Sequence, residues 1–245
     1  MSGQRFSLDR LRPLSYIGAG ALLAACPAPA PLIPAPLAPA SRDSAVAWAR
    51  ATLPPQPTVI RFRWRYADGR VRYGGRGSAR IAPPDSMRFD FVGPLGLGSG
   101  AAVVIGDRVA WSDPERSFRS LVPAIPMLWA SLGMVQPPGD SAAVFRGEGQ
   151  ASGSAAAPRA ARALWRFADE GDTLDYVATN GLERMLEAEW RRGTVVARSR
   201  TVLDAQARPM GARVDFPEAS ARFELTVVGV DTAAVIPPAL WRSRR

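Results

Sequence analysis

The stretch TVIRFRWRY, residues 58–66, decides the fold class of this chain. Its apolar side chains, from Ile60 to Tyr66, alternate with arginines. This period of two is typical of a β-strand with one buried face and one solvent-facing side. The dipeptide Asp68-Gly69 follows directly and favours a tight hairpin turn. The sequence therefore predicts an antiparallel sheet with one apolar face.

The same period returns along the rest of the chain, up to the segment 219–230. Asn180-Gly181 is a second strong hairpin signal. Successive strands are not separated by helical segments, which argues against a parallel α/β sheet. Residues 141–159 are rich in Ala, Gly and Ser and are expected to be a mobile stretch or a weak strand. We predict a mainly β protein, with about eleven strands in a single antiparallel sheet curled into an incomplete barrel.

Two short helices are expected beside this sheet. The first spans residues 41–53, with Ser41 or Asp43 as its cap and Val46, Ala49 and Leu53 on one face. The second is the apolar segment IPMLWASL at 125–132. Two such helices can close the mouth of a curved sheet without filling its interior.

The composition excludes several kinds of chemistry. The 245 residues carry a net charge of +9, every basic residue is Arg, and there is no His and one Cys. His-based catalysis and Lys Schiff bases are therefore excluded. The acidic groups at 169–172 surround a turn, and those at 183–189 lie on a strand, with no nucleophile–base pair among them. We expect no enzymatic activity, no metal and no cofactor.

The segment LLAAC at 22–26 ends in that one cysteine, Cys26, and resembles a bacterial lipobox. Arg5, Arg10 and Arg12 precede an apolar stretch of about twelve residues, which is too short to span a bilayer. The resemblance implies that residues 1–25 are a signal peptide and that Cys26 carries lipid chains, which anchor at about 0.8 kcal/mol per buried methylene. The alternative is a plain secretory signal with a chance cysteine.

Residues 26–40 are interpreted as the lipidated cysteine and a proline-rich tether. A polyproline II segment at 27–39 would hold the domain up to about 40 Å from the membrane, and a disordered tail would also act as a tether. Pro27 stands where Asp marks inner-membrane retention in many diderm bacteria, so we expect the outer membrane, facing the periplasm. Residues 41–231 form the domain, and residues 232–245 an Arg-rich tail. Behind an export signal, the basic balance favours anionic lipid head groups as partners, and we expect no nucleic acid partner. Because the arginines are spread along alternating strand positions, a solvated outer face is the default interpretation.

The segment MRFDFVGPLGLGSGAAVVIGDRVAWSD, residues 87–113, carries a family resemblance. Together with the lipobox, the tether and the meandering strands, it resembles the LolA/LolB superfamily of periplasmic lipoprotein carriers. Because a lipobox is present, the chain resembles the membrane-anchored, LolB-like members of the superfamily more than its soluble carriers. The resemblance implies a monomeric receptor that takes acyl chains of lipoproteins or lipids and passes them to the membrane, with a soluble periplasmic carrier as a candidate donor.

This resemblance implies an apolar cavity and a membrane-contacting loop. In the loop 93–98, Leu95 or Leu97 would touch the membrane, unless both fold back as a plug on the sheet. The residues expected to line the cavity could instead form an ordinary core, as in an envelope sensor or assembly factor with the same fold. The expected cavity and lid residues are Ile60, Phe62, Trp64, Met87, Phe89, Phe91, Trp111, Ile125, Met127, Leu128, Trp129, Leu132, Leu225 and Val227.

Overall fold

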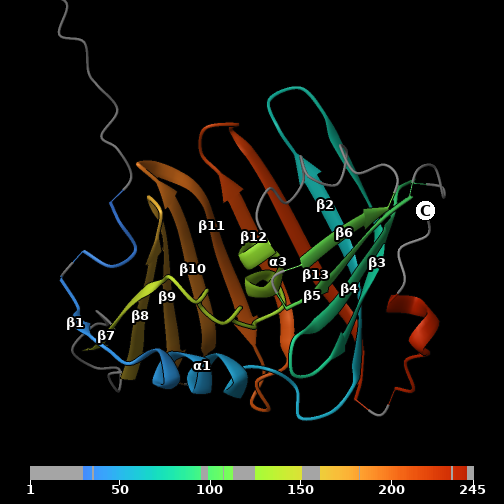
Figure 1. The fold of residues 1–245 in the computed structure, drawn as a ribbon. Helices are drawn as coiled ribbons and strands as arrows, with labels where there is room; N and C mark the ends of the chain where they lie inside the picture. The colour runs from blue at the N-terminus through green and yellow to red at the C-terminus, as the bar shows by residue number, and fades with distance from the viewer. Residues whose placement is uncertain are drawn as a thin grey trace, which may run out of the picture.

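A computed structural model describes residues 30–34, 36–94, 99–106, 108–112, 125–150, 161–181, 183–232 and 234–241. Cys26, Leu95 and Leu97 lie outside the described residues. Thirteen strands form one sheet in the order β1-β7-β8-β9-β10-β11-β12-β13-β2-β3-β4-β5-β6, and every neighbouring pair is antiparallel (Figure 1). The sheet curls but does not close, since β1 and β6 are its two edges. The predicted fold class is confirmed, with thirteen strands in place of about eleven.

The strands run in two meanders, β2–β6 and β7–β13, which join where β13 pairs with β2. Within the described residues, two α-helices and a 3₁₀ helix, η2, accompany them. The bounds of all elements, in chain order, are β1 Ala38–Pro39, α1 Arg42–Ala51, β2 Thr58–Ala67, β3 Arg72–Ala82, β4 Ser86–Val92, β5 Ser99–Ile105, β6 Arg108–Ser112, α3 Ile125–Ser131, β7 Ala143–Gln150, β8 Ala161–Asp169, β9 Asp172–Asn180, β10 Arg184–Arg192, β11 Thr194–Leu203, β12 Pro209–Phe216, β13 Ala221–Asp231 and η2 Pro238–Trp241.

The two additional strands are β7, where a mobile stretch or a weak strand was expected, and β1, where no strand was expected. β7 lies within the Ala-, Gly- and Ser-rich stretch 141–159, and β1 within the proline-rich tether. Gly147 of β7 leaves room for the side chain of Leu37, whose Cδ2 would lie 2.7 Å from a Cβ at that position. Residues 38–39 therefore belong to the sheet and not to a spacer that stands clear of the domain.

Helix α1 lies along one end of β8–β10 in the view of Figure 1. Ser41 is its N-cap, as predicted, and accepts a hydrogen bond from the amide of Ser44 at 3.2 Å. Of the predicted face, Ala49 is fully buried and Leu53 packs against the core, whereas Val46 is only half-buried and Ala45 is buried beside them. Thr52 Oγ1 accepts from Val135 N at 2.9 Å, which ties the end of α1 to the segment after α3.

Helix α3 packs on the concave face of the sheet against β10, β11 and β12 (Figure 1). Gly133 ends it with a φ of +77°, a backbone conformation that glycine adopts without strain. The amides of Gly133 and Met134 close this terminus on the carbonyls of Ala130 and Trp129 at 2.9 and 3.0 Å. Thr201 Oγ1 of β11 also donates to the Ala130 carbonyl, at 2.6 Å, and fixes the helix to the sheet.

Candidate functional site

The concave face of β2–β4 is filled by aromatic side chains in mutual contact. The residues predicted to line a cavity on β2 and β4 all point to this face and are at most 8% exposed. They are Ile60, Phe62, Trp64, Met87, Phe89 and Phe91. The ring centroids of Phe62 and Phe89 are 5.0 Å apart, and those of Trp64 and Phe91 are 5.8 Å apart. These residues form a packed core in this half of the sheet.

Glycines opposite the rings provide the room for this packing. A Cβ on Gly77 would lie 2.5 Å from Phe62 Cε2, and one on Gly100 would lie 2.2 Å from Phe91 Cε1. β3 passes through Gly74, Gly75 and Gly77 in regular register with β2. Gly77 therefore makes room for the ring of Phe62, whereas a Cβ on Gly74 or Gly75 would first meet the backbone carbonyl of Trp64 at 2.6 Å or of Val92 at 2.0 Å.

The expected lid residues of α3 are core residues as well. Met127, Leu128, Trp129 and Leu132 are at most 3% exposed, and Ile125 is partly buried against the same cluster. Leu225 is buried in it, and Val227 is partly buried. Trp111 lies in β6 opposite Ala102, and its side chain is outside those described. Whether any of these residues meets a ligand stays a prediction.

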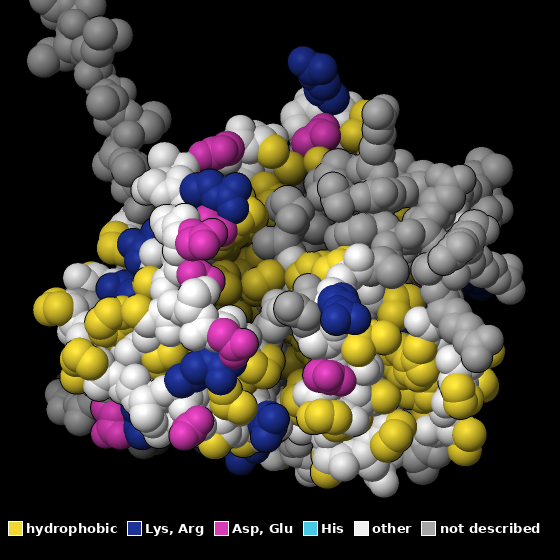
Figure 2. All heavy atoms as spheres, viewed as in Figure 1, with side chains coloured by type: hydrophobic (Ala, Val, Ile, Leu, Met, Phe, Trp, Pro, Cys, Tyr) yellow, Lys and Arg dark blue, Asp and Glu magenta, His cyan; other side chains and the backbone are white. Residues whose placement is uncertain are grey.

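An apolar cavity of about 570 Å³ lies elsewhere on the concave side, between the end of α1, the turn after α3 and the ends of β9–β13. Figure 2 shows hydrophobic atoms gathered in the hollow of this face. Of the predicted lining, only Ile60 borders the cavity. Met134, whose flexible side chain suits a lipid contact, also lines the cavity. Its other apolar walls, which were not predicted from the sequence, include Trp48, Leu53, Ala178, Met185, Leu186, Leu203 and Val230.

Trp48 of α1 anchors this helix to the aromatic residues of β8 and β9. Its ring stacks on Trp165 of β8 at 5.2 Å and meets the edge of Tyr176 of β9 at 6.0 Å. The hydroxyl of Tyr176 is buried without a hydrogen-bond partner among the described residues, and burial raises the pKa of this phenol. α1 thus covers β8 and β9 tightly and leaves the cavity open beside its C-terminal end.

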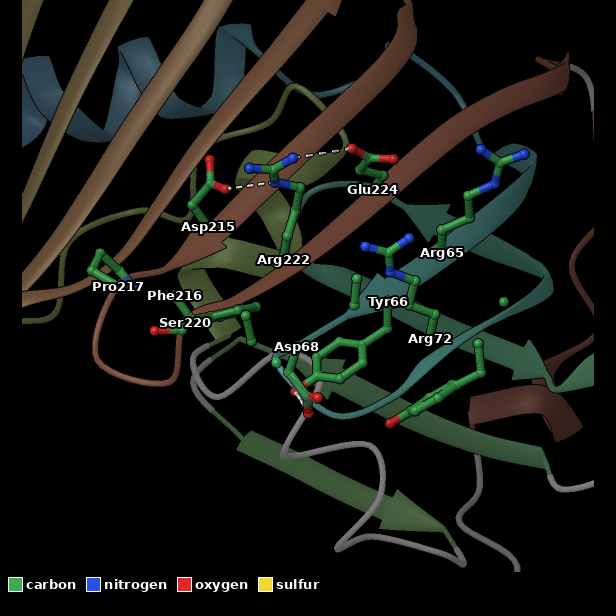
Figure 3. A pocket seen from close by; sticks show the side chains of 15 residues that line it. Arg65, Tyr66, Asp68, Arg72, Asp215, Phe216, Pro217, Ser220, Arg222 and Glu224 are labelled. Atoms are coloured by element: carbon green, nitrogen blue, oxygen red, sulfur yellow. Dashed lines mark hydrogen bonds and ion pairs between the residues drawn. The ribbon is translucent and has the colours of Figure 1, made fainter.

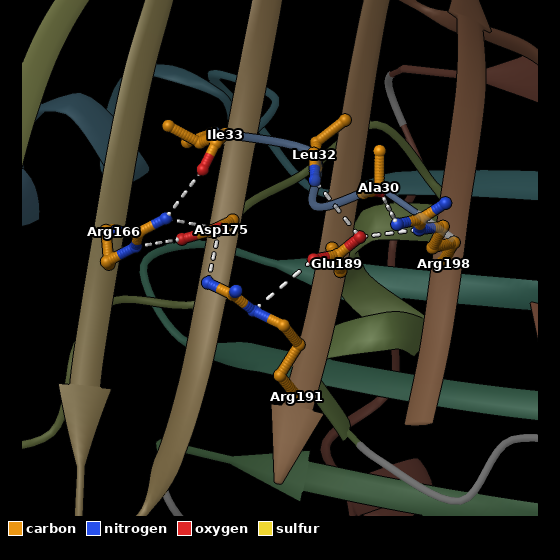
Figure 4. Close-up of polar contacts among 8 residues, drawn as sticks. All are labelled: Ala30, Leu32, Ile33, Arg166, Asp175, Glu189, Arg191 and Arg198. Carbon is orange, nitrogen blue, oxygen red and sulfur yellow. Dashed lines mark hydrogen bonds and ion pairs between the residues drawn. The ribbon is translucent and has the colours of Figure 1, made fainter. Parts of the chain in front are cut away.

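The convex face carries a buried cluster of charged side chains (Figure 4). Asp175 and Glu189 face each other on β9 and β10 and are completely buried. Arg166 binds Asp175 in a bidentate pair of 2.6 and 2.9 Å. Arg191 bridges the two carboxylates at 2.9 and 3.3 Å, and Arg198 reaches Glu189 at 2.5 Å. Glu189, a sequence candidate for chemistry, is thereby committed to ion pairs.

Residues 30–34 close over this cluster. The amide of Leu32 donates to Glu189 Oε2 at 3.2 Å, and Arg166 Nη2 donates to the carbonyl of Ile33 at 3.0 Å. Arg198 also donates to the carbonyl of Ala30, and the side chain of Ile33 is buried. This part of the predicted tether is held against the domain, contrary to the expectation of a free spacer up to residue 39.

The described ranges bear on two further features, a metal site and a membrane-spanning helix. These residues contain no group of three or more His, Cys, Asp or Glu side chains placed to hold a metal ion. Among the helices of the described part, none is both long and apolar enough to cross a bilayer.

A recess of about 900 Å³ at the rim between the β2–β3 and β12–β13 turns is lined by charged, tyrosyl and other side chains (Figure 3).

Comparison with known proteins identifies the fold. No family model and no curated protein matches the sequence. A LolA superfamily protein, NE2245 from Nitrosomonas europaea, matches in structure with a TM-score of 0.57 at 9% identity, covering 83% of this chain and 98% of that one. A putative outer membrane lipoprotein-sorting protein domain from Vibrio parahaemolyticus gives 0.48 at 8% identity, covering 82% and 100%. The chain has the LolA-superfamily fold, which confirms the resemblance at the level of fold.

Proposed function

We propose that this protein is a lipid-anchored lipoprotein of the bacterial cell envelope that binds acyl chains of lipoproteins or lipids and passes them to the outer membrane. The LolA-superfamily fold supports a role in handling lipids or lipoproteins. The lipobox-like segment ending at Cys26 supports the anchor. Transfer is non-covalent and follows differences in affinity, so it needs neither nucleotide nor metal. A soluble periplasmic carrier is a suitable donor.

The observation that carries this proposal is the apolar cavity beside the end of α1. Its volume of about 570 Å³ lies within the range of small-molecule sites, roughly 300–1,000 Å³. The walls combine rigid residues such as Trp48 with two methionines, Met134 and Met185. Methionine adapts its shape to flexible apolar groups. A hydrocarbon chain buried there would gain about 0.8 kcal/mol per methylene.

A cavity-filling substitution tests the proposal. Ala178 lines the cavity from β9, so Ala178→Trp places an indole where the acyl chain would lie. The matched control is Ala219→Trp in the exposed turn between β12 and β13. A fluorescent fatty acid should bind the parent chain and the control at micromolar concentrations or below, and A178W at least tenfold more weakly. Equal binding by both variants, or no binding by a folded parent chain, contradicts the proposal.

A second candidate function is an envelope sensor or assembly factor without a transferable ligand. The dense aromatic packing over β2–β4 favours it, because that half of the concave face is occupied by the protein's own side chains. The two candidates differ in the fatty-acid titration. A sensor or assembly factor would leave the probe unbound while remaining fully folded.

A further inference from the structure

We propose that the convex face of β2 and β3 binds the surface of an anionic phospholipid bilayer. This arginine face consists of Arg61, Arg63 and Arg65 on β2 and of Arg72 and Arg76 on β3. The inference goes beyond the acyl-binding cavity, which lies on the opposite side of the sheet. It concerns the folded domain itself and does not require the lipid on Cys26.

The strand geometry brings these arginines together on one surface. Arg61, Arg63 and Arg65 alternate with buried residues and are all exposed. Arg63 lies directly opposite Arg76 in the β2–β3 register, so like charges face each other across the ladder. Such a pair is unfavourable in an isolated sheet. A counter-charge supplied from outside the chain would relieve it.

Several other arginines of the convex face are matched by acids. Arg166 and Arg198 bind buried carboxylates, and Arg80 and Arg88 share Asp90 at 2.5 and 2.8 Å. For the five members of the arginine face, no carboxylate of the described residues lies within ion-pair distance. Glu224 stands opposite Arg65, but its described ion pair is with Arg222 at 4.0 Å. Figure 3 shows this contrast, with dashed contacts on Arg222 and none on Arg65 or Arg72.

Exposed apolar side chains border the same surface. Arg61, Arg63 and Arg76 line a recess of about 590 Å³ together with Asp90, Asp231 and the apolar Val228 and Val235, which are 58% and 93% exposed. At the other end, Val71 beside the β2–β3 turn is 46% exposed. Arginines that bind headgroups beside aliphatic groups that enter the interface are the pattern of a peripheral membrane surface. A nucleic acid or an acidic protein would match the charge but would not require these apolar neighbours.

Vesicle sedimentation tests this inference with residues 26–245 carrying Cys26→Ser, which include every described residue and lack the lipid anchor. Binding to vesicles of phosphatidylcholine mixed with phosphatidylglycerol should exceed binding to phosphatidylcholine alone, and added salt should weaken it. Each arginine near an anionic surface contributes about fivefold in affinity. The variant Arg63→Gln/Arg76→Gln should therefore bind about 30-fold more weakly.

The matched control is Arg146→Gln/Arg192→Gln, which makes the same change in net charge. Both arginines are exposed and lie outside β2 and β3. Arg146 pairs with Glu148 at 3.1 Å, and Arg192 pairs with Asp172 at 2.7 Å. The control should retain most of the binding, and thermal unfolding should show both variants folded. Equal losses in the two variants, or no preference of the parent chain for anionic vesicles, would overturn the inference. Neither result depends on the cavity, whose test is the fatty-acid titration of A178W.

Discussion

Asp175→Asn should destabilise the protein strongly, because Asp175 is the buried centre of the charged cluster on the convex face. Its carboxylate is completely buried and holds Arg166 at 2.6 and 2.9 Å and Arg191 at 2.9 Å. Asparagine keeps the shape but removes the charge and one acceptor oxygen. Arg166 also donates to the carbonyl of Ile33, so the substitution weakens the attachment of residues 30–34.

The size of the effect follows from the burial of the partners. Removing one member of a buried ion pair costs about 3–5 kcal/mol. Arg166 and Arg191 are 21% and 25% exposed, so water can partly solvate them once the charge is gone. We therefore expect the lower end, a loss of about 3 kcal/mol in the free energy of unfolding. For a chain of this length that corresponds to a decrease in Tm of about 6–12 °C.

Urea unfolding and a thermal melt at neutral pH measure both quantities. The matched control is Asp172→Asn on the same strand, whose partner Arg192 is 66% exposed. An exposed pair of this kind contributes at most about 1 kcal/mol. If D175N loses no more stability than D172N, the argument that burial makes the cluster important is wrong. Faster amide exchange at Leu32 in D175N would show that the attached segment is released.

Three further predictions concern the core, the helix attachment and the rim. Gly77→Ala should cost about 1–3 kcal/mol in the free energy of unfolding, since its Cβ would lie 2.5 Å from Phe62; an unchanged urea midpoint would contradict the packing described. Thr52→Val should cost about 1–3 kcal/mol by leaving the amide of Val135 unpaired, with Thr52→Ser as the conservative control. The side-chain hydrogen bonds from Arg192 hold the pKa of Asp172 below its ordinary value, so NMR titration should show that pKa rising in Arg192→Gln. Because the folded-state pKa is lowered, the stability contributed by the Arg192–Asp172 pair is present above the ordinary pKa of Asp and is lost as the pH falls through the lowered value. An unchanged pKa of Asp172 in Arg192→Gln would refute the assignment.

The strand pattern was readable because alternation and turn residues act locally. Residues 58–66 form a strand as predicted, and Asp68 Oδ1 closes the following turn by accepting from the amides of Arg70 and Val71 at 2.7 and 2.8 Å. β1 could not be found in this way, because a two-residue strand has no period and depends on β7 for its hydrogen bonds. β7 owes its conformation to β8 on one side and to the covering tether on the other.

The site was less predictable than the fold, because the alternating pattern shows which residues face inward but not how much space they fill. Phe62 and Phe91 face inward as expected, yet the small Gly77 and Gly100 opposite them let the rings lie flat and pack. The cavity forms where α1 ends and several strands end, and this depends on contacts between distant segments. Leu203 and Val230, for example, are about a hundred and fifty residues or more from Trp48, and no short pattern connects them.

Mass spectrometry of the lipids that co-purify with the protein from its native envelope tests the central claim most directly. We expect about one bound acyl-bearing molecule per folded chain, retained in A219W and lost in A178W. A folded parent chain that carries no acyl lipid beyond its own anchor, or equal lipid content in both variants, would contradict it.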